Sequence, residues 1–293
     1  MTERGGAPPL LLDAGGTPAT GTAGVQISDC PASRIAAAFA HCRTEKRVAL
    51  MPFVTAGYPS LPLSERLVVA LGEGGADLIE IGVPFSDPLA DGTTVQRTSQ
   101  QSLASGTRLV DCLELVRRLR TVHGMTVPLI LMGYYNPFFQ YGVERFAADA
   151  ASVGVDGVIV PDLPAEESDE LLAACRRHGR DLIFLLAPTS TDARVRAVAT
   201  RASGFIYCVS LLGVTGARAT LSAGLPDYLA RIRHQTALPL AVGFGISTAE
   251  HVREVAEHAD GAIVASALIN HLDALPEAEQ PAAATAFVRT LRG

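Results

Sequence analysis

The chain has 293 residues, a length that suits one large domain or two small ones, and 48% of them are hydrophobic. Only 5% are aromatic and tryptophan is absent, so the core must consist mainly of aliphatic side chains. The net charge of -6 and the isoelectric point near 5.6 give no electrostatic basis for binding nucleic acid. No apolar run approaches the ~18 residues of a membrane span, so we expect no membrane partner either.

The first 30 residues are rich in Gly, Pro, Ala and Thr and lack the apolar segment of a secretory signal. We therefore expect residues 1–30 to be a disordered extension and residues 31–293 to form a single domain. The five cysteines are scattered and include no CxxC pair, which is typical of free thiols in the reducing cytoplasm.

After the extension, a short helix is predicted to begin at Ser33, because apolar Ile35, Phe39 and Cys42 share one helical face and Ser33 can cap it. Eight short apolar runs then follow, each succeeded by a helical pattern. Their continuous apolar character is typical of parallel strands covered on both faces. The runs are Val48–Val54, Leu78–Ile81, Pro128–Met132, Gly157–Val160, Leu182–Leu186, Phe205–Val209, Pro239–Val242 and Ala262–Ala265.

Eight strand-then-helix units predict an α/β protein with a (β/α)8 barrel and an extra N-terminal helix. A doubly wound open sheet is the alternative, but such sheets usually stop at about five to seven strands. No GxGxxG motif follows the first predicted strand, which also disfavours that alternative. The long interval between the second and third strands predicts a further helix near residues 94–103.

Carboxylates gather where the second predicted strand ends. The active site of a (β/α)8 barrel is built from the C-terminal ends of its strands and the loops after them. Glu80 lies within an apolar strand, so we expect its pKa to rise by ~1–2 units, toward the range useful for proton transfer. A structural acid bound to backbone groups is the alternative for Glu80. Asp91 precedes a glycine, and Asp-Gly is also an ordinary turn pair.

Other kinds of catalytic group are poorly placed. The only lysine, Lys46, precedes the first strand and falls at the opposite end of the barrel, which excludes Schiff-base chemistry in the site. The seven histidines lie on predicted helices or just before strands, so we expect solvated or helix-face side chains. Metal-ligand spacing is absent, and no metal site is predicted. Proton transfer by carboxylates, with Tyr and Thr hydroxyls in support, remains.

Three glycine- or alanine-rich loops follow strands 6, 7 and 8, at residues 213–216, 243–247 and 264–267. The loops after strands 7 and 8, with a helix N-terminus, form the phosphate site common in this fold. Backbone N–H groups bind the phosphate there, so small residues are needed and no Lys or Arg is required. The three loops together predict a phosphate site.

One sequence motif is long and specific: P-F-S-D-P-L-A-D-G at residues 84–92, preceded by Glu80-Ile-Gly. On this motif and five shorter ones, which occur in order over about residues 46–270, the chain resembles the tryptophan synthase alpha subunit family. The shorter motifs are P-F-V-T-A-G-Y-P (52–59), Y-Y-N-P (134–137), V-P-D-L-P-x-E-E (160–167), S-x-x-G-V-T-G (210–216) and G-F-G-I-S (243–247).

The resemblance implies retro-aldol cleavage of indole-3-glycerol phosphate to indole and glyceraldehyde 3-phosphate, without a metal or Schiff base. It implies that Glu80 is the general acid/base and that Asp91 holds the indole N–H. Thr215 would tie the closing loop to Asp91. The indole pocket would be formed by Phe53, Ile159, Tyr207 and Phe244. The phosphate would be bound by Gly216, Gly245, Ala265 and Ser266.

From the cysteines we expect a cytoplasmic protein. The resemblance also implies an alpha2-beta2 assembly, in which a beta subunit carries pyridoxal phosphate and this chain carries no cofactor. Asp87 and Asn136 match partner-facing positions. Thr93 departs from the family's usual Pro, and Ala265 from its usual Gly, but neither change removes a catalytic residue. Two alternatives are a stand-alone indole-3-glycerol phosphate lyase and a barrel that acts mainly as allosteric partner of a beta subunit.

Overall fold

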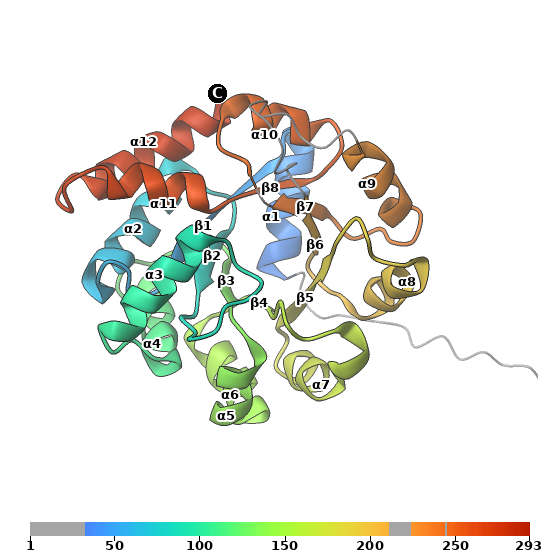
Figure 1. The fold of residues 1–293 in the computed structure, drawn as a ribbon, viewed down its shortest axis with the longest axis horizontal. Helices are drawn as coiled ribbons and strands as arrows, with labels where there is room; N and C mark the ends of the chain where they lie inside the picture. The colour runs from blue at the N-terminus through green and yellow to red at the C-terminus, as the bar shows by residue number, and fades with distance from the viewer. Residues whose placement is uncertain (1–32, 211–223, 244) are drawn as a thin grey trace, which may run out of the picture. The chain divides into compact units, whose positions relative to one another are not determined.

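The computed structural model describes residues 33–210, 224–243 and 245–293. The expected disorder of residues 1–30 therefore lies outside the described residues. Eight parallel strands pair in chain order and close into a barrel, and helices surround them (Figure 1). The predicted (β/α)8 barrel is confirmed, and the open sheet is excluded because β1 pairs with β8.

Each strand begins and ends within one residue of its predicted limits. The strands are β1 Ala49–Thr55, β2 Ile79–Gly82, β3 Leu129–Met132, β4 Gly157–Ile159, β5 Asp181–Leu186, β6 Ile206–Val209, β7 Leu240–Gly243 and β8 Gly261–Val264.

Helices follow the strands, and the interval between β2 and β3 holds two of them, of which α3 is the one predicted near residues 94–103. None of the helices in the described part of the chain combines the length and apolar character needed to cross a membrane. The helices are α1 Arg34–Thr44, α2 Leu61–Gly74, α3 Thr93–Ala104, α4 Leu109–Thr121, α5 Tyr135–Tyr141, α6 Val143–Val153, η1 Ala165–Glu167, α7 Asp169–Arg177, α8 Asp192–Arg201, α9 Leu225–Arg233, α10 Ala249–Ala256, α11 Ser266–Asp273 and α12 Gln280–Arg292.

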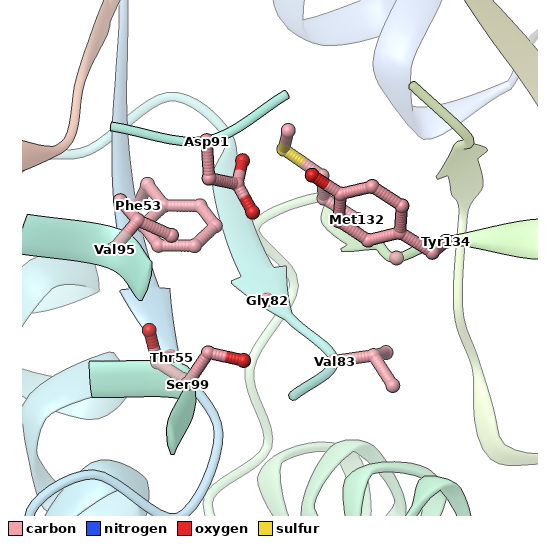
Figure 2. A pocket seen from close by; sticks show the side chains of 10 residues that line it. Phe53, Thr55, Gly82, Val83, Asp91, Val95, Ser99, Met132 and Tyr134 are labelled. Atoms are coloured by element: carbon pink, nitrogen blue, oxygen red, sulfur yellow. The ribbon is translucent and has the colours of Figure 1, made fainter. Parts of the chain in front are cut away.

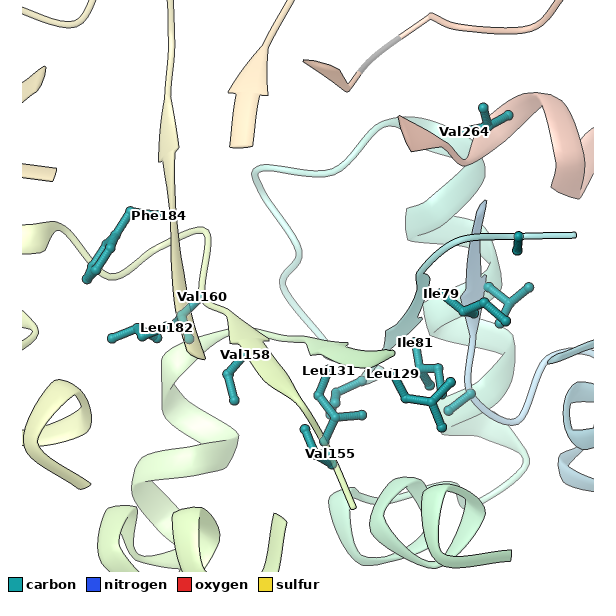
Figure 3. Packing of buried hydrophobic residues seen from close by; sticks show 14 of the residues in the cluster. Ile79, Ile81, Leu129, Leu131, Val155, Val158, Val160, Leu182, Phe184 and Val264 are labelled. Atoms are coloured by element: carbon teal, nitrogen blue, oxygen red, sulfur yellow. The ribbon is translucent and has the colours of Figure 1, made fainter. Parts of the chain in front are cut away.

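Alternation along the strands builds two cores. Ile79 and Ile81 of β2 pack outward against the helices, together with Leu129 and Leu131 of β3 (Figure 3). The intervening residues belong to a second cluster, which fills the barrel interior. In β2 the intervening residue is Glu80, so a carboxylate points into the barrel where its neighbours along the chain point out.

The predicted N-terminal helix α1 packs against the barrel interior. Ser33 caps it by accepting a hydrogen bond from the backbone N–H of Ala36 at 3.1 Å. Ile35, Phe39 and Cys42 are buried, as the helical spacing predicts, and they join the interior cluster. The ring of Phe39 lies 5.6 Å from that of Phe205, the residue before β6. Because Phe205 precedes a strand, α1 covers the N-terminal end of the barrel.

Acids at this same end are held by arginines and by the neighbouring strand. Asp77, which precedes β2, accepts hydrogen bonds from Arg47 at 2.8 Å and from the backbone N–H of Leu50 at 2.9 Å. Asp156, before β4, accepts the N–H of Leu129, and Asp260, before β8, that of Leu240, each at 2.8 Å. Each of these acids also pairs with an arginine. These three aspartates are therefore held in place at the N-terminal end of the barrel, each by a neighbouring strand and an arginine.

Candidate active site

A cavity of about 320 Å³ opens where β1, β2, β3, β6 and β8 end. Its volume lies within the roughly 300–1,000 Å³ range of small-molecule sites. Among the described residues, no Lys, Arg or His lines it, and its only acidic side chains come from Glu80 and Asp91. It is lined by Phe53, Glu80, Asp91, Gly92, Val95, Met132, Tyr207, Gly245, Ile246, Ser247, Ile263, Ala265, Ser266, Ala267 and Asn270.

Glu80 is the more buried of the two acids. It lies on β2 in register with Phe53 of β1 and Ile130 of β3, and only 1% of its surface is exposed. Its Oε1 has no hydrogen-bond partner among the described residues. Burial raises the pKa of Glu80 from 4.5 to about 8, a larger rise than the sequence led us to expect. At neutral pH the side chain therefore holds a proton that a substrate can receive.

Asp91 lies in the loop between β2 and α3, and Gly92 after it is the N-cap of α3. Burial raises the pKa of Asp91 to about 6, while a hydrogen bond with the Tyr134 hydroxyl acts in the opposite direction. The pKa values of the two acids are thus separated, with Asp91 ionised and Glu80 protonated near neutrality. Such a separation assigns different roles to two carboxyl groups in one site.

Tyr134, which follows β3, holds the loop that carries Asp91. Its hydroxyl accepts a hydrogen bond from the backbone N–H of Ala90 at 2.8 Å, and its ring stacks on Phe85 at 4.9 Å. Figure 2 shows the hydroxyl directed toward the Asp91 carboxylate, with Phe53 on the other side of that carboxylate. Ser99 of α3 binds both the N–H and the C=O of Phe85, at 2.8 and 3.0 Å. The loop is therefore fixed at both ends.

Tyr207 closes the side of the cavity formed by β6. It is 5% exposed, and burial raises the pKa of its hydroxyl well above the usual value, with further contributions from Glu80 and Asp91. Gly243 on β7 provides the space for this side chain, because a Cβ there would lie 2.1 Å from the Tyr207 hydroxyl oxygen. Tyr207 is therefore a neutral hydroxyl facing two acids.

Two of the three loops predicted to bind phosphate, those after β7 and β8, line another part of the same cavity, and the third (213–216) lies outside the described residues. Gly245 has φ of +81°, a left-handed conformation that favours glycine, and it lines the cavity. Ala265 is the N-cap of α11, and Ser266 is the first residue of that helix. The first N–H groups of a helix lack partners within it and carry partial positive charge, which suits an anion.

Several predicted residues fall elsewhere. Ile159 packs inside the barrel and does not line the cavity. Asp87 and Asn136, which were predicted to face a partner and not the substrate, are exposed after β2 and β3 and do not line the cavity. The predicted substrate-contacting Thr215 and Phe244, and phosphate-binding Gly216, lie outside the described residues.

Sequence reasoning missed Met132 and Asn270, which line the cavity, and His251, the only buried histidine among those described. The position of Met132 at the end of β3 was a usable signal for the first. Within the described part of the chain, no three His, Cys, Asp or Glu side chains are grouped closely enough to hold a metal ion.

Comparisons with known proteins agree with this geometry. The profile of the tryptophan synthase alpha chain family matches residues 39–291. A tryptophan synthase alpha chain of Roseiflexus sp. (strain RS-1) is 58% identical over 89% of this chain and 100% of its own length. That of Geobacter sulfurreducens is 50% identical over 89% of this chain and 98% of its own.

Solved structures give the same answer. The tryptophan synthase subunit alpha of Legionella pneumophila str. Paris superposes with a TM-score of 0.81 at 38% identity, over 89% of this chain and 97% of the other. A chain of Mycobacterium tuberculosis tryptophan synthase superposes with a TM-score of 0.80 at 38% identity, with the same coverage. Since the profile and the relatives span the whole barrel with the paired acids at its mouth, this chain belongs to the tryptophan synthase alpha chain family.

Proposed function

We propose that this chain is a carbon–carbon lyase that cleaves indole-3-glycerol phosphate to indole and glyceraldehyde 3-phosphate. The observation that carries the proposal is the carboxyl group of Glu80. It is buried, its Oε1 has no partner among the described residues, and its raised pKa leaves it protonated at neutral pH at the wall of the cavity. A group with these properties can give a proton to a carbon atom and then take one from a hydroxyl.

In net terms, the reaction moves one proton from a side-chain hydroxyl to C3 of the indole ring and breaks one C–C bond. Protonation of the indole ring at C3 turns the ring into an electron acceptor. The hydroxyl on the adjacent side-chain carbon loses its proton, an aldehyde C=O forms there, and the C–C bond electrons return to the ring. Glu80, protonated first, supplies the ring proton and then, as a carboxylate, receives the hydroxyl proton. Protons and electrons therefore balance in this reaction without an oxidant, a metal or an amine.

Asp91 is proposed to act on the indole nitrogen. Positive charge develops on that nitrogen when C3 is protonated, and an ionised carboxylate beside it stabilises the charge. The pKa of about 6 leaves Asp91 ionised at neutral pH, so it is ready for this role while Glu80 is still protonated. Phe53, Tyr207 and Met132 supply apolar walls for the ring.

Gly245, Ala265 and Ser266 are proposed to bind the phosphate, and Gly216 is assigned to the same group by its motif. The first three line the cavity, and the N-terminus of α11 supplies backbone N–H donors. Neutral donors suffice there because backbone amides bind phosphate without Lys or Arg in many sites. The phosphate end thus orients the substrate, and the acids act on the indole end.

The test is release of indole by Glu80→Gln, which keeps the shape of the side chain but cannot exchange a proton. Loss of general acid/base catalysis costs about a hundredfold to ten-thousandfold in rate, and we expect kcat to fall by that amount while phosphate affinity is kept. Glu277→Gln, at an exposed position, is the matched control. Turnover by Glu80→Gln within a few fold of the wild type would contradict the proposed mechanism.

We also propose that the chain assembles with a tryptophan synthase beta subunit, as an alpha2-beta2 complex in which the partner carries pyridoxal phosphate. Leu89 is 90% exposed and Phe139 is 54% exposed, and they lie near Asp87 and Asn136 in the chain. Large apolar side chains exposed beside polar ones are typical of a protein–protein contact. Pyridoxal phosphate would need a lysine for its Schiff base, and Lys46 lies at the opposite end of the barrel from this cavity.

Size-exclusion chromatography with the beta subunit tests the assembly, and co-elution at micromolar concentration is expected. Indole release with and without the beta subunit then separates the remaining possibilities. Full activity without co-elution would favour a stand-alone lyase. Co-elution without indole release in either assay would leave an allosteric partner alone.

A further inference from the structure

His251 lies on α10, the helix after β7, and only 6% of its surface is exposed. Its Nδ1 accepts a hydrogen bond from the backbone N–H of Ser247 at 3.3 Å, and the Ser247 hydroxyl lies at the same distance. Ser247 belongs to the short loop after β7 whose residues line the cavity. The imidazole therefore touches the back of the loop that is proposed to bind phosphate.

The local geometry is a variant of a known helix start. Thr248 is the N-cap of α10, and its hydroxyl accepts the backbone N–H of His251 at 3.2 Å. In a capping box, the side chain three residues after the cap reaches back to a backbone N–H at the helix start, and that side chain is usually Glu or Gln. Here the imidazole of His251 takes this place and binds the N–H one residue before the cap. The loop and the helix are thus joined by two reciprocal hydrogen bonds.

This arrangement divides the N–H groups of the loop. The backbone N–H of Ser247 donates to His251. The described residues offer no acceptor for the backbone N–H groups of Gly245 and Ile246. Gly245 and Ile246 line the cavity. Ile246 is only 2% exposed, and a buried N–H without an acceptor is costly unless a ligand or water binds it. Gly245 is exposed, so its N–H is open to a ligand in the cavity. Fixing Ser247 leaves the two preceding donors for an anion.

We infer that His251 is a positioning residue for phosphate binding: it holds the loop after β7 so that the N–H groups of Gly245 and Ile246 remain available to the phosphate of the substrate. The inference rests on the proposed function for the identity of the substrate. It assigns to His251 no contact with the reacting atoms. Its role needs only an acceptor at the position of Nδ1.

The side chains that distinguish this role are Leu and Gln. His251→Leu fills similar space but has no acceptor, whereas His251→Gln restores the acceptor of an ordinary capping box. His258→Gln is the matched control, because His258 follows α10 at the opposite end of the same unit and is exposed. Binding of inorganic phosphate, measured by calorimetry, and the KM and kcat for indole release are the two readouts.

We expect His251→Leu to bind inorganic phosphate roughly tenfold more weakly, a change that corresponds to about 1.4 kcal/mol. KM should rise to a similar extent while kcat at saturation changes little, because the acids at the indole end are untouched. His251→Gln should recover most of the affinity. His258→Gln should match the wild type in both readouts.

Unchanged phosphate affinity and KM in His251→Leu would overturn the inference, as would equal losses in His251→Leu and His251→Gln. If His251→Leu does not fold, His251→Asn replaces it, since its shorter side chain carries an acceptor that does not reach Ser247. A wild-type protein that binds phosphate but releases no indole would contradict the proposed function alone. The phosphate titration would still decide the role of His251.

Discussion

Gly82 of β2 provides the space for the ring of Phe53 on β1, since a Cβ atom at position 82 would lie 2.4 Å from Cζ of Phe53. Phe53 is in register with Glu80 and lines the same cavity. The glycine two residues after the acid therefore decides how close an aromatic wall can come to it. A close contact of this kind ties the shape of the cavity to a single backbone position.

Gly82→Ala should displace Phe53 and reduce both stability and activity. Overpacking of a core by one methyl group costs about 1–3 kcal/mol, and we expect a loss of this size in urea unfolding, together with a raised KM for the substrate. Gly72→Ala is the control: it lies within α2, where a Cβ would meet the far end of the flexible Met125 side chain at 2.9 Å and Val127 at an ordinary contact distance of 3.8 Å. If Gly82→Ala matched the wild type in both measurements, the close contact between Gly82 and the Phe53 ring would matter neither for stability nor for substrate binding.

Glu80→Gln should become more stable relative to the wild type as the pH rises. The folded protein holds the Glu80 proton up to a pKa of about 8, whereas the unfolded chain releases it near 4.5, so wild-type stability falls as the pH rises between these values. Above the folded-state pKa, the wild type should have lost stability of the order of 4 kcal/mol relative to Glu80→Gln. Urea unfolding of both proteins at about pH 5 and about pH 8.5 measures it. A pH-independent difference would contradict the raised pKa.

Tyr134→Phe should shift the acidic limb of the pH–rate profile upward. The hydroxyl lowers the pKa of Asp91 by hydrogen bonding, so its removal leaves burial to raise that pKa above about 6. The ionised fraction of Asp91 then falls in mildly acidic solution, and kcat/KM should drop there more than at high pH. Tyr135→Phe, whose hydroxyl lies 3.5 Å from Glu170, is the control. Parallel profiles for the two variants would argue against the role of Tyr134.

Leu89→Ser should weaken association with a beta subunit without changing the activity of the isolated chain. Leu89 is 90% exposed and does not line the cavity. A few residues carry most of the affinity in many interfaces, and truncating one of them costs about 1–4 kcal/mol. Val122→Ser is the control, since Val122 is 61% exposed but precedes β3 at the other end of the barrel. Equal affinities of the two variants would place the interface elsewhere.

The strands of this fold could be located closely from the sequence for a physical reason. Strands covered on both faces are continuous apolar runs, and each is preceded by polar or turn residues such as Asp77 and Asp156. Those aspartates accept hydrogen bonds from backbone N–H groups of a neighbouring strand, so their positions just before the strands have a structural cause. What the sequence did not reveal was the inward and outward alternation within each run.

The catalytic acids of the candidate site could be predicted from the sequence better than the residues that line the cavity. Glu80 was found because a carboxylate inside an apolar strand has few explanations, and its burial is confirmed. His251 was missed because a histidine on a helical pattern resembles a solvated one, and its contact with Ser247 depends on the turn between β7 and α10. Ile159 was expected in the pocket, and it does belong to the interior cluster, but it is fully buried there and does not line the cavity.

The basal position of Lys46 has a practical consequence. It is the only lysine in the chain, it is exposed, and it lies in the turn between α1 and β1, away from the cavity. An amine-reactive dye or a coupling surface can therefore react at this side chain and at the terminal amine, with no lysine near the acids to modify. Protein molecules immobilised through Lys46 would present the C-terminal end of the barrel, where the cavity opens, to the solution. This orientation suits direct measurement of substrate and subunit binding.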